Sequence, residues 1–153
     1  MPEYQNISTL IKILKECLEE DGDILFAYLY GSSVFHPDLY GKDIGIAVYL
    51  KTSDIKSYVR KEEELTTLLI LKLHTDQIDL RILNVLPLII QHRILKDGVL
   101  IFSRDDLGRV DFETEVMVRY FEIKPYLNEY IQILTQRIRG ELNENCSYPP
   151  NVF

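Results

Sequence analysis

Residues 29–50 read LYGSSVFHPDLYGKDIGIAVYL, and this stretch decides the fold. It opens on the end of an apolar and aromatic run, Ile24 to Tyr30, which is typical of a strand. Gly31 and Ser32 follow directly, and after a spacer of ten residues Asp43 begins a second apolar run. The stretch therefore predicts two strands joined through a Gly-Ser turn, with an acid at the head of the second strand.

The Gly-Ser turn has the composition of an anion site. Glycine allows a backbone to approach a ligand closely and to adopt torsions that other residues resist. Ser32 can cap a short helical turn, whose free N–H groups and serine hydroxyl together bind anions. We therefore expect Gly31 and Ser32 to be able to hold a phosphate group.

The second strand predicts a place for a metal ligand. Because side chains alternate between the two faces of a strand, one of its faces is entirely apolar and the other begins with Asp43. The apolar face carries Ile44, Ile46, Val48 and Leu50, and the other carries Asp43, Gly45, Ala47 and Tyr49. Asp43 is thus expected to point away from the core, near the Gly-Ser turn. A carboxylate there can bind a hard cation such as Mg²⁺.

A third strand is predicted at Gln77 to Leu83, with the sequence QIDLRIL. Its alternation places Asp79 on a polar face, together with Arg81. If this strand lies beside the strand of Asp43, the two carboxylates converge. Arg81 could instead pair with Asp79, which would make Asp79 structural, and the sequence leaves both possibilities open.

These residues resemble the nucleotidyltransferase superfamily of DNA polymerase beta. The family pattern is Gly-Ser, ten residues, Asp-x-Asp and a third acid on a later strand. The chain is similar to the minimal nucleotidyltransferases (MNT), the antitoxin halves of HEPN/MNT toxin–antitoxin pairs, and the likeness extends to LPLIIQHRILKDGVLIF (86–102) and VMVRYFEIKPYLNEYIQIL (116–134). The resemblance implies an α/β (α+β) fold, with a small mixed sheet flanked by helices and further helices at the C-terminal end.

The resemblance also implies a site and a partner. Gly31 and Ser32 would bind the triphosphate, while Asp43 and Asp79 would be catalytic and would bind metal. The implied cofactors are Mg²⁺ and ATP, and the implied partner is a HEPN-family toxin. The protein would neutralise that toxin by transferring AMP from Mg-ATP to one of its tyrosines.

One position departs from the family pattern. The second Asp of the pattern falls on Gly45, which has no metal ligand to offer. In such enzymes two metal ions clamp the attacking and leaving oxygens, so the loss of a bridging ligand could lower the rate by about 10²–10⁴-fold. The alternative is therefore a catalytically impaired module that masks its partner without chemistry. A third hypothesis is a nucleotidyltransferase acting on a cationic small molecule such as an aminoglycoside.

Composition narrows the class of protein. The 153 residues are 46% hydrophobic and 27% charged, which suits one globular domain, predicted over residues 1–140 with a polar tail at 141–153. The net charge of −7 argues against a broad nucleic-acid surface and suits a basic protein partner.

Cys17 and Cys146 offer no metal-ligand spacing and are interpreted as free thiols. Without a signal peptide or a membrane-length apolar run, the expected location is the cytoplasm.

Periodicity predicts the remaining elements. Amphipathic helices are expected at Ile7 to Glu20, from the Asp54 cap to about His74, and at Leu88 to Lys96. Val99 to Phe102 is expected to form a short strand at a sheet edge. Two further helices are predicted at Asp111 to Glu122 and Pro125 to Arg139, with a break at Pro125 and an end at Gly140.

Overall fold

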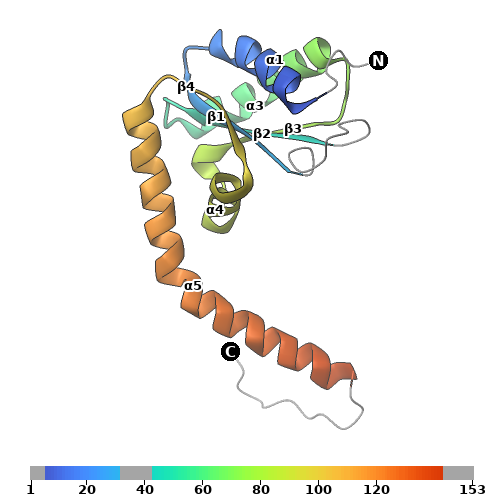
Figure 1. Cartoon of the computed structure of the whole chain (residues 1–153), viewed down its shortest axis with the longest axis vertical. Helices are drawn as coiled ribbons and strands as arrows, with labels where there is room; N and C mark the ends of the chain where they lie inside the picture. Colours follow the sequence, from blue (N-terminus) through green and yellow to red (C-terminus); the bar gives the residue numbers. More distant parts are fainter. Residues whose placement is uncertain (1–5, 32–42, 143–153) are drawn as a thin grey trace. The chain divides into compact units, whose positions relative to one another are not determined.

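The computed structural model describes residues 6–31 and 43–142. Ser32 and Cys146 lie outside the described residues, as does the tail beyond residue 142. The chain divides into two compact units, residues 1–116 and 117–153, and each is described by itself (Figure 1).

The first unit is built from a four-stranded sheet and its flanking helices (Figure 1). In chain order its elements are α1 (Ile7–Glu19), β1 (Ile24–Tyr30), β2 (Ile44–Leu50), α3 (Ile55–Leu73), β3 (Ile78–Ile82), the 3₁₀ turn η1 (Leu83–Val85), α4 (Leu88–Asp97), β4 (Val99–Ser103) and the beginning of α5 (Asp106–Leu142). These bounds confirm the predicted strands and the first three predicted helices to within a few residues.

Local sequence explains where the helices begin and end. The Asn6 side chain accepts a hydrogen bond from the Thr9 N–H at 2.9 Å and so caps the start of α1. Asp54 caps α3 in the same way through the Lys56 N–H. His74 ends α3 in a left-handed conformation with φ of 54°.

The sheet is mixed, with strand order β3-β2-β1-β4. Strand β1 lies antiparallel to β2 and to β4, whereas β2 lies parallel to β3. The predicted position of the Val99 strand at a sheet edge is confirmed. The strands that carry Gly31, Gly45 and Asp79 are therefore consecutive neighbours.

Helices α1 and α3 cover one face of this sheet. The cluster on this face includes every side chain of the predicted apolar face of β2, and all of these are buried. The helices contribute Leu10, Leu14 and Leu18 from α1, and Tyr58, Leu65, Leu69 and Leu73 from α3. The apolar stripes of α1 and α3 therefore pack against the face of β2 that carries Ile44, Ile46, Val48 and Leu50.

The other face of the sheet is also covered, which the sequence did not predict. A second cluster there joins Phe26, Ala47 and Ile94, and Ala47 has no exposed surface. The Phe26 and Tyr49 rings stack with centroids 4.6 Å apart, and Phe112 from the first turns of α5 packs against both. The face that begins with Asp43 is thus solvated only near its end and is buried farther along.

Helix α5 corrects two predictions. It runs without interruption from Asp106 to Leu142, with Pro125 inside it, where two helices with a break were expected. Proline removes one backbone hydrogen bond, but strong helix formers on both sides continue the pattern. The helix also passes through Gly140, which was expected to end it.

The described part of the chain also tests the expectations about Cys17 and about membrane-spanning helices. Cys17 is a free, half-buried thiol, and its burial raises the pKa of that thiol. Within residues 6–31 and 43–142, no helix has the length and apolar character needed to cross a membrane.

Candidate functional site

The register of the sheet brings the predicted acids to one end of two neighbouring strands. In the parallel pair β2–β3, Gly45 lies directly opposite Asp79, and the Ile44 N–H donates to the Gln77 carbonyl at 2.8 Å. Asp43 immediately precedes β2 and is exposed. The expected adjacency of the two strands is therefore confirmed, and Asp79 shares a face with position 45.

Gly31 occupies the end of β1 in a conformation that favours glycine. Its φ is +92°, a region that side chains with a β-carbon rarely adopt, and an added β-carbon would meet no atom within 4 Å. The backbone here is exposed and open to a ligand. Its predicted companion, Ser32, lies in the segment that the structure leaves undescribed.

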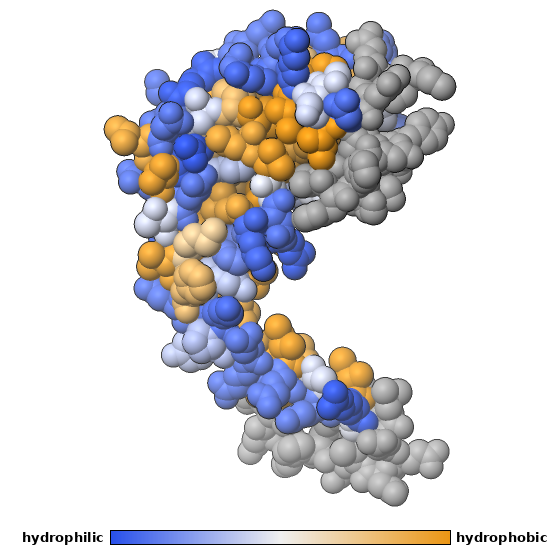
Figure 2. Space-filling model, viewed as in Figure 1, coloured by the Kyte–Doolittle hydropathy of each residue, from blue (hydrophilic) through white to orange (hydrophobic). Residues whose placement is uncertain are grey.

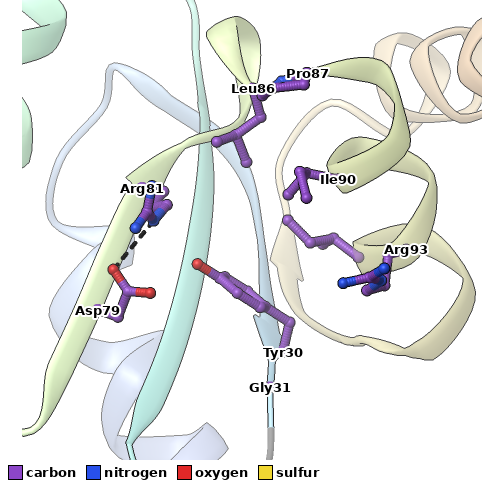
Figure 3. A pocket seen from close by; sticks show the side chains of 9 residues that line it. Tyr30, Gly31, Asp79, Arg81, Leu86, Pro87, Ile90 and Arg93 are labelled. Atoms are coloured by element: carbon purple, nitrogen blue, oxygen red, sulfur yellow. Dashed lines mark hydrogen bonds and ion pairs between the residues drawn. The ribbon is translucent and has the colours of Figure 1, made fainter. Parts of the chain in front are cut away.

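Gly31 and Asp79 line one cavity of about 510 Å³ (Figure 3). Most of its wall is apolar and comes from α4 and from the two residues between η1 and α4, and three charged side chains reach it. The lining residues are Tyr30, Gly31, Asp79, Arg81, Leu86, Pro87, Ile90, Arg93 and Ile94. Asp43 is not among the described residues that line it.

Asp79 is held by an arginine on its own strand. The Arg81 Nε atom lies 3.2 Å from Asp79 Oδ1, and both side chains are about half exposed, at 55% and 50%. Such an exposed pair contributes only about 0–1 kcal/mol to stability. The contact engages one oxygen of the Asp79 carboxylate, Oδ1, and places a positive charge beside it. The Asp79–Arg81 pair that the sequence allowed is thus observed, on a strand that does lie beside β2.

Position 45 has no room for a side chain. A β-carbon on Gly45 would lie 2.7 Å from the Tyr30 carbonyl oxygen and 3.0 Å from Cε2 of the Tyr30 ring. Tyr30 is the antiparallel partner of Gly45, and Figure 3 shows its ring reaching from β1 across β2 toward Asp79 and Arg81. The backbone oxygen is the harder obstacle, since it moves only if the strand moves. Tyr30 therefore occupies the space that a side chain at position 45 would need.

Tyr30 is the residue of the site that sequence reasoning missed. Its hydroxyl is buried and makes no hydrogen bond of ordinary geometry within the described residues, although Asp79 and Arg81 lie near enough to influence its pKa. Burial, followed by the nearby Asp79 carboxylate, raises the pKa of Tyr30 to about 12. The signal available in the sequence was an aromatic residue at a position that pairs with a glycine, an arrangement in which the ring covers the missing side chain. That signal requires the register, which periodicity does not supply.

The side chains that the structure describes do not by themselves complete the two-metal site that the resemblance implies. Such a site needs several hard oxygen ligands around each ion. Here Asp79 is paired with a cation and position 45 provides no ligand. Within the described part of the chain, no three His, Cys, Asp or Glu side chains gather into a metal-binding group.

A family model described as polymerase beta nucleotidyltransferase matches residues 12–107. The chain belongs to the polymerase beta nucleotidyltransferase family. The match spans α1 through the first residues of α5, so it contains the sheet, the cavity and Gly45. No curated protein sequence matches this family member significantly.

Solved structures show the same fold in toxin–antitoxin complexes. A chain of a toxin–antitoxin complex with AMP-PNP aligns with a TM-score of 0.63 and 16% identity, covering 82% of this nucleotidyltransferase-family chain and 98% of that one. A chain of the MntA–HepT complex aligns with a TM-score of 0.60 and 15% identity, covering 84% of this chain and 99% of that one. A third match is a chain of the complex described as tri-AMPylated Shewanella oneidensis HEPN toxin with MNT antitoxin. It aligns with a TM-score of 0.55 and 18% identity, covering 84% of this chain and 94% of that one. At these identities the likeness establishes the fold.

Proposed function

We propose that the protein is an antitoxin of the MNT type that neutralises a HEPN toxin in the cytoplasm by binding it, without transferring AMP. The observation that carries the proposal is the contact between Gly45 and Tyr30, which occupies the space that a side chain at position 45 would need. A nucleotidyltransferase fold with an incomplete metal motif retains its surfaces for partner binding, whereas the rate of nucleotide transfer depends on the metal ligands.

The fold comparisons support the identity of the partner. The aligned chains come from complexes described as MntA–HepT and as HEPN toxin with MNT antitoxin. The alignments cover 99% and 94% of those chains and 84% of this one, so nearly all of each of those subunits has a counterpart here. The net charge of −7 favours a basic partner surface.

The second unit supplies a surface suited to such binding. Its helix, the part of α5 from residue 117 onward, displays large apolar and aromatic side chains, and Figure 2 shows hydrophobic groups on the surface of this segment. Tyr126 is 73% exposed and Phe121 61%. The other exposed members of the set are Val118, Tyr130, Ile131 and Ile138. Aromatic residues are enriched at the centres of protein interfaces, so we place the toxin-binding surface here.

Transfer of AMP from Mg-ATP to a toxin tyrosine is the competing function. It is favoured by the placement of Asp43 and Asp79 at the same end of adjacent strands, with Gly31 close to Asp79. The two functions predict different behaviour of carboxylate variants, because masking does not use these carboxylates.

The test is neutralisation of a HEPN toxin co-expressed in bacteria, scored by growth. We expect the double variant Asp43→Ala, Asp79→Asn to rescue growth as well as the wild type. The double variant Tyr126→Asp, Tyr130→Asp should fail to rescue, because charges enter the apolar surface. Asn128→Asp is the matched control, since it adds a charge to the same helix at an exposed polar position, and it should rescue.

Mass spectrometry of the co-expressed toxin separates the two mechanisms directly. Unmodified toxin tyrosines in the rescued cells support masking. Rescue that disappears with the Asp43 and Asp79 substitutions, together with AMP on a toxin tyrosine, would replace masking with catalysis.

A further inference from the structure

We propose that the cavity bounded by β1, β3 and α4 binds a small organic anion with an apolar body, and that it does so without a divalent metal. This inference concerns the isolated chain and does not depend on toxin binding. It is carried by the size of the cavity, the character of its wall and the charges that reach into it.

The cavity has the dimensions and lining of a small-molecule site. Its volume of about 510 Å³ falls within the range of about 300–1,000 Å³ that is usual for ligand pockets. Its apolar wall combines Leu86 and Pro87 near η1 with Ile90 and Ile94 of α4. A flat aromatic or aliphatic body would replace water along this wall, and its burial is favourable in proportion to the apolar area removed from water.

The charges within the cavity favour an anion. Arg81 on β3 and Arg93 on α4 reach it from different sides, as Figure 3 shows, while Asp79 is the one acid in its described lining. Asp79 is already paired with Arg81, and in the described part of the chain no ion pair involves Arg93. The lining thus carries one excess positive charge in a chain whose net charge is −7. Guanidinium groups bind phosphate and carboxylate through paired N–H donors.

Tyr30 adds an aromatic ring to the wall. The ring lines the cavity, while its hydroxyl is buried in the field of Asp79 and Arg81. Because burial raises the pKa of Tyr30 to about 12, the hydroxyl keeps its proton near neutral pH and adds no negative charge that would repel an anion.

The same observations separate this ligand from a metal-bound nucleotide. A metal-nucleotide complex needs several carboxylates to hold the ion, whereas the described lining offers one, Asp79, with a guanidinium beside it. The arginines can instead neutralise the anion themselves. A small anionic head on a compact apolar body matches both the two arginines and the apolar wall.

The experiment is calorimetric titration of the full chain with 1-naphthyl phosphate in the presence of EDTA. We expect saturable binding of one ligand per chain that is unchanged when EDTA is replaced by Mg²⁺. 2-Naphthol, which lacks the anion, and inorganic phosphate, which lacks the apolar body, should each bind at least about tenfold more weakly. A parallel titration with 1-naphthoate shows whether the site prefers a phosphate or a carboxylate head, and either preference agrees with the proposal.

Variants locate the site. Arg93→Gln should weaken binding of 1-naphthyl phosphate by about tenfold or more, as expected for loss of a charge-assisted hydrogen bond. Arg60→Gln is the matched control, because Arg60 is an exposed arginine of α3 outside the cavity lining, and it should leave the affinity unchanged. Arg93 is itself exposed, so its variant is expected to fold, which far-UV circular dichroism verifies.

Three results would overturn the proposal. These are the absence of saturable binding, binding that requires Mg²⁺, and equal affinities of the Arg93→Gln and Arg60→Gln variants. None of these results affects the growth assay for toxin masking. The ligand site can therefore be disproved without disproving the proposed antitoxin function, and the reverse also holds.

Discussion

The backbone of Gly45 approaches β1 more closely than any side chain at position 45 would permit. The nearest atom to an added β-carbon is the Tyr30 carbonyl oxygen, at 2.7 Å. Strain of this kind begins with the first carbon of the side chain and does not depend on its charge. A variant meant to restore the acid therefore meets a steric obstacle before it can bind a metal.

We predict that Gly45→Ala and Gly45→Asp both lower the free energy of unfolding, by about 1–3 kcal/mol, as is usual when atoms are forced into a packed site. Gly45→Asp should lose more than Gly45→Ala, because both add the obstructed β-carbon and the aspartate also places a carboxylate at a buried position opposite Asp79. Urea unfolding followed by circular dichroism measures the loss. An alanine variant as stable as the wild type would show that the strands separate easily at this position.

At this scale the sequence predicted which residues approach one another but not how they interact. The alternation of QIDLRIL was enough to place Asp79 and Arg81 on one face, and the observed ion pair follows from that spacing. The role of Tyr30 could not be predicted, because it depends on the pairing of Tyr30 with Gly45 across two strands. Register is fixed by the whole sheet and its turns, and no single strand pattern contains it.

Among the elements, the short turn η1 binds the backbone at the end of β2 through one side chain. The Asn84 side chain accepts a hydrogen bond from the Leu50 N–H at 2.9 Å and donates one to the Leu50 carbonyl at 3.0 Å. It thereby pairs the last residue of β2 as a neighbouring strand would. Backbone groups in this partly buried position would otherwise have to find water.

We predict that Asn84→Ala lowers the free energy of unfolding by about 1–3 kcal/mol, because it leaves both backbone groups of Leu50 without these partners. Asn84→Asp should not restore this stability, since it keeps the acceptor for the Leu50 N–H but sets a carboxylate oxygen against the Leu50 carbonyl in place of the donor. Asn128→Ala, at an exposed position of α5, should change stability by no more than about 0.5 kcal/mol. Equal stabilities of the Asn84→Ala and Asn128→Ala variants would mean that water replaces the Asn84 side chain without cost.

Element prediction succeeded where apolar periodicity was strong and failed where a single residue was given too much weight. The strands and α1 followed from alternation and from a helical stripe. Pro125 was expected to divide the C-terminal region, yet α5 continues through it. A proline costs about 3 kcal/mol in a helix interior, which a helix of 37 residues with many other hydrogen bonds can absorb.

For the whole molecule, the sheet is covered on both faces, and this places two tyrosines of β1 in environments that oppose ionisation. Burial raises the pKa of Tyr30 to about 12, and burial together with the hydrogen bond to Glu113 raises the pKa of Tyr28 still further. In the unfolded chain both phenols titrate near pH 10. Between these values the folded protein holds protons that the unfolded chain has released.

We predict that the free energy of unfolding is insensitive to the Tyr30 phenol below about pH 10 and falls as the pH rises from about 10 to about 12. The sign follows from linkage, since stability decreases with pH wherever the native state binds more protons. Tyr30→Phe should decline less steeply over this range, whereas the control Tyr130→Phe, at an exposed position of α5, should follow the wild type. Urea unfolding at a series of pH values measures the slopes, and parallel curves for wild type and Tyr30→Phe would contradict the prediction.

The contact between Tyr30 and Gly45 also limits how this sheet can be engineered. The ring of Tyr30 can be removed by substitution, but the carbonyl oxygen that lies 2.7 Å from an added β-carbon belongs to the backbone of β1 and remains whatever residue stands at position 30. A metal ligand introduced at position 45 therefore requires a local shift of β1 away from β2, and a second substitution at Tyr30 relieves only the contact with the ring.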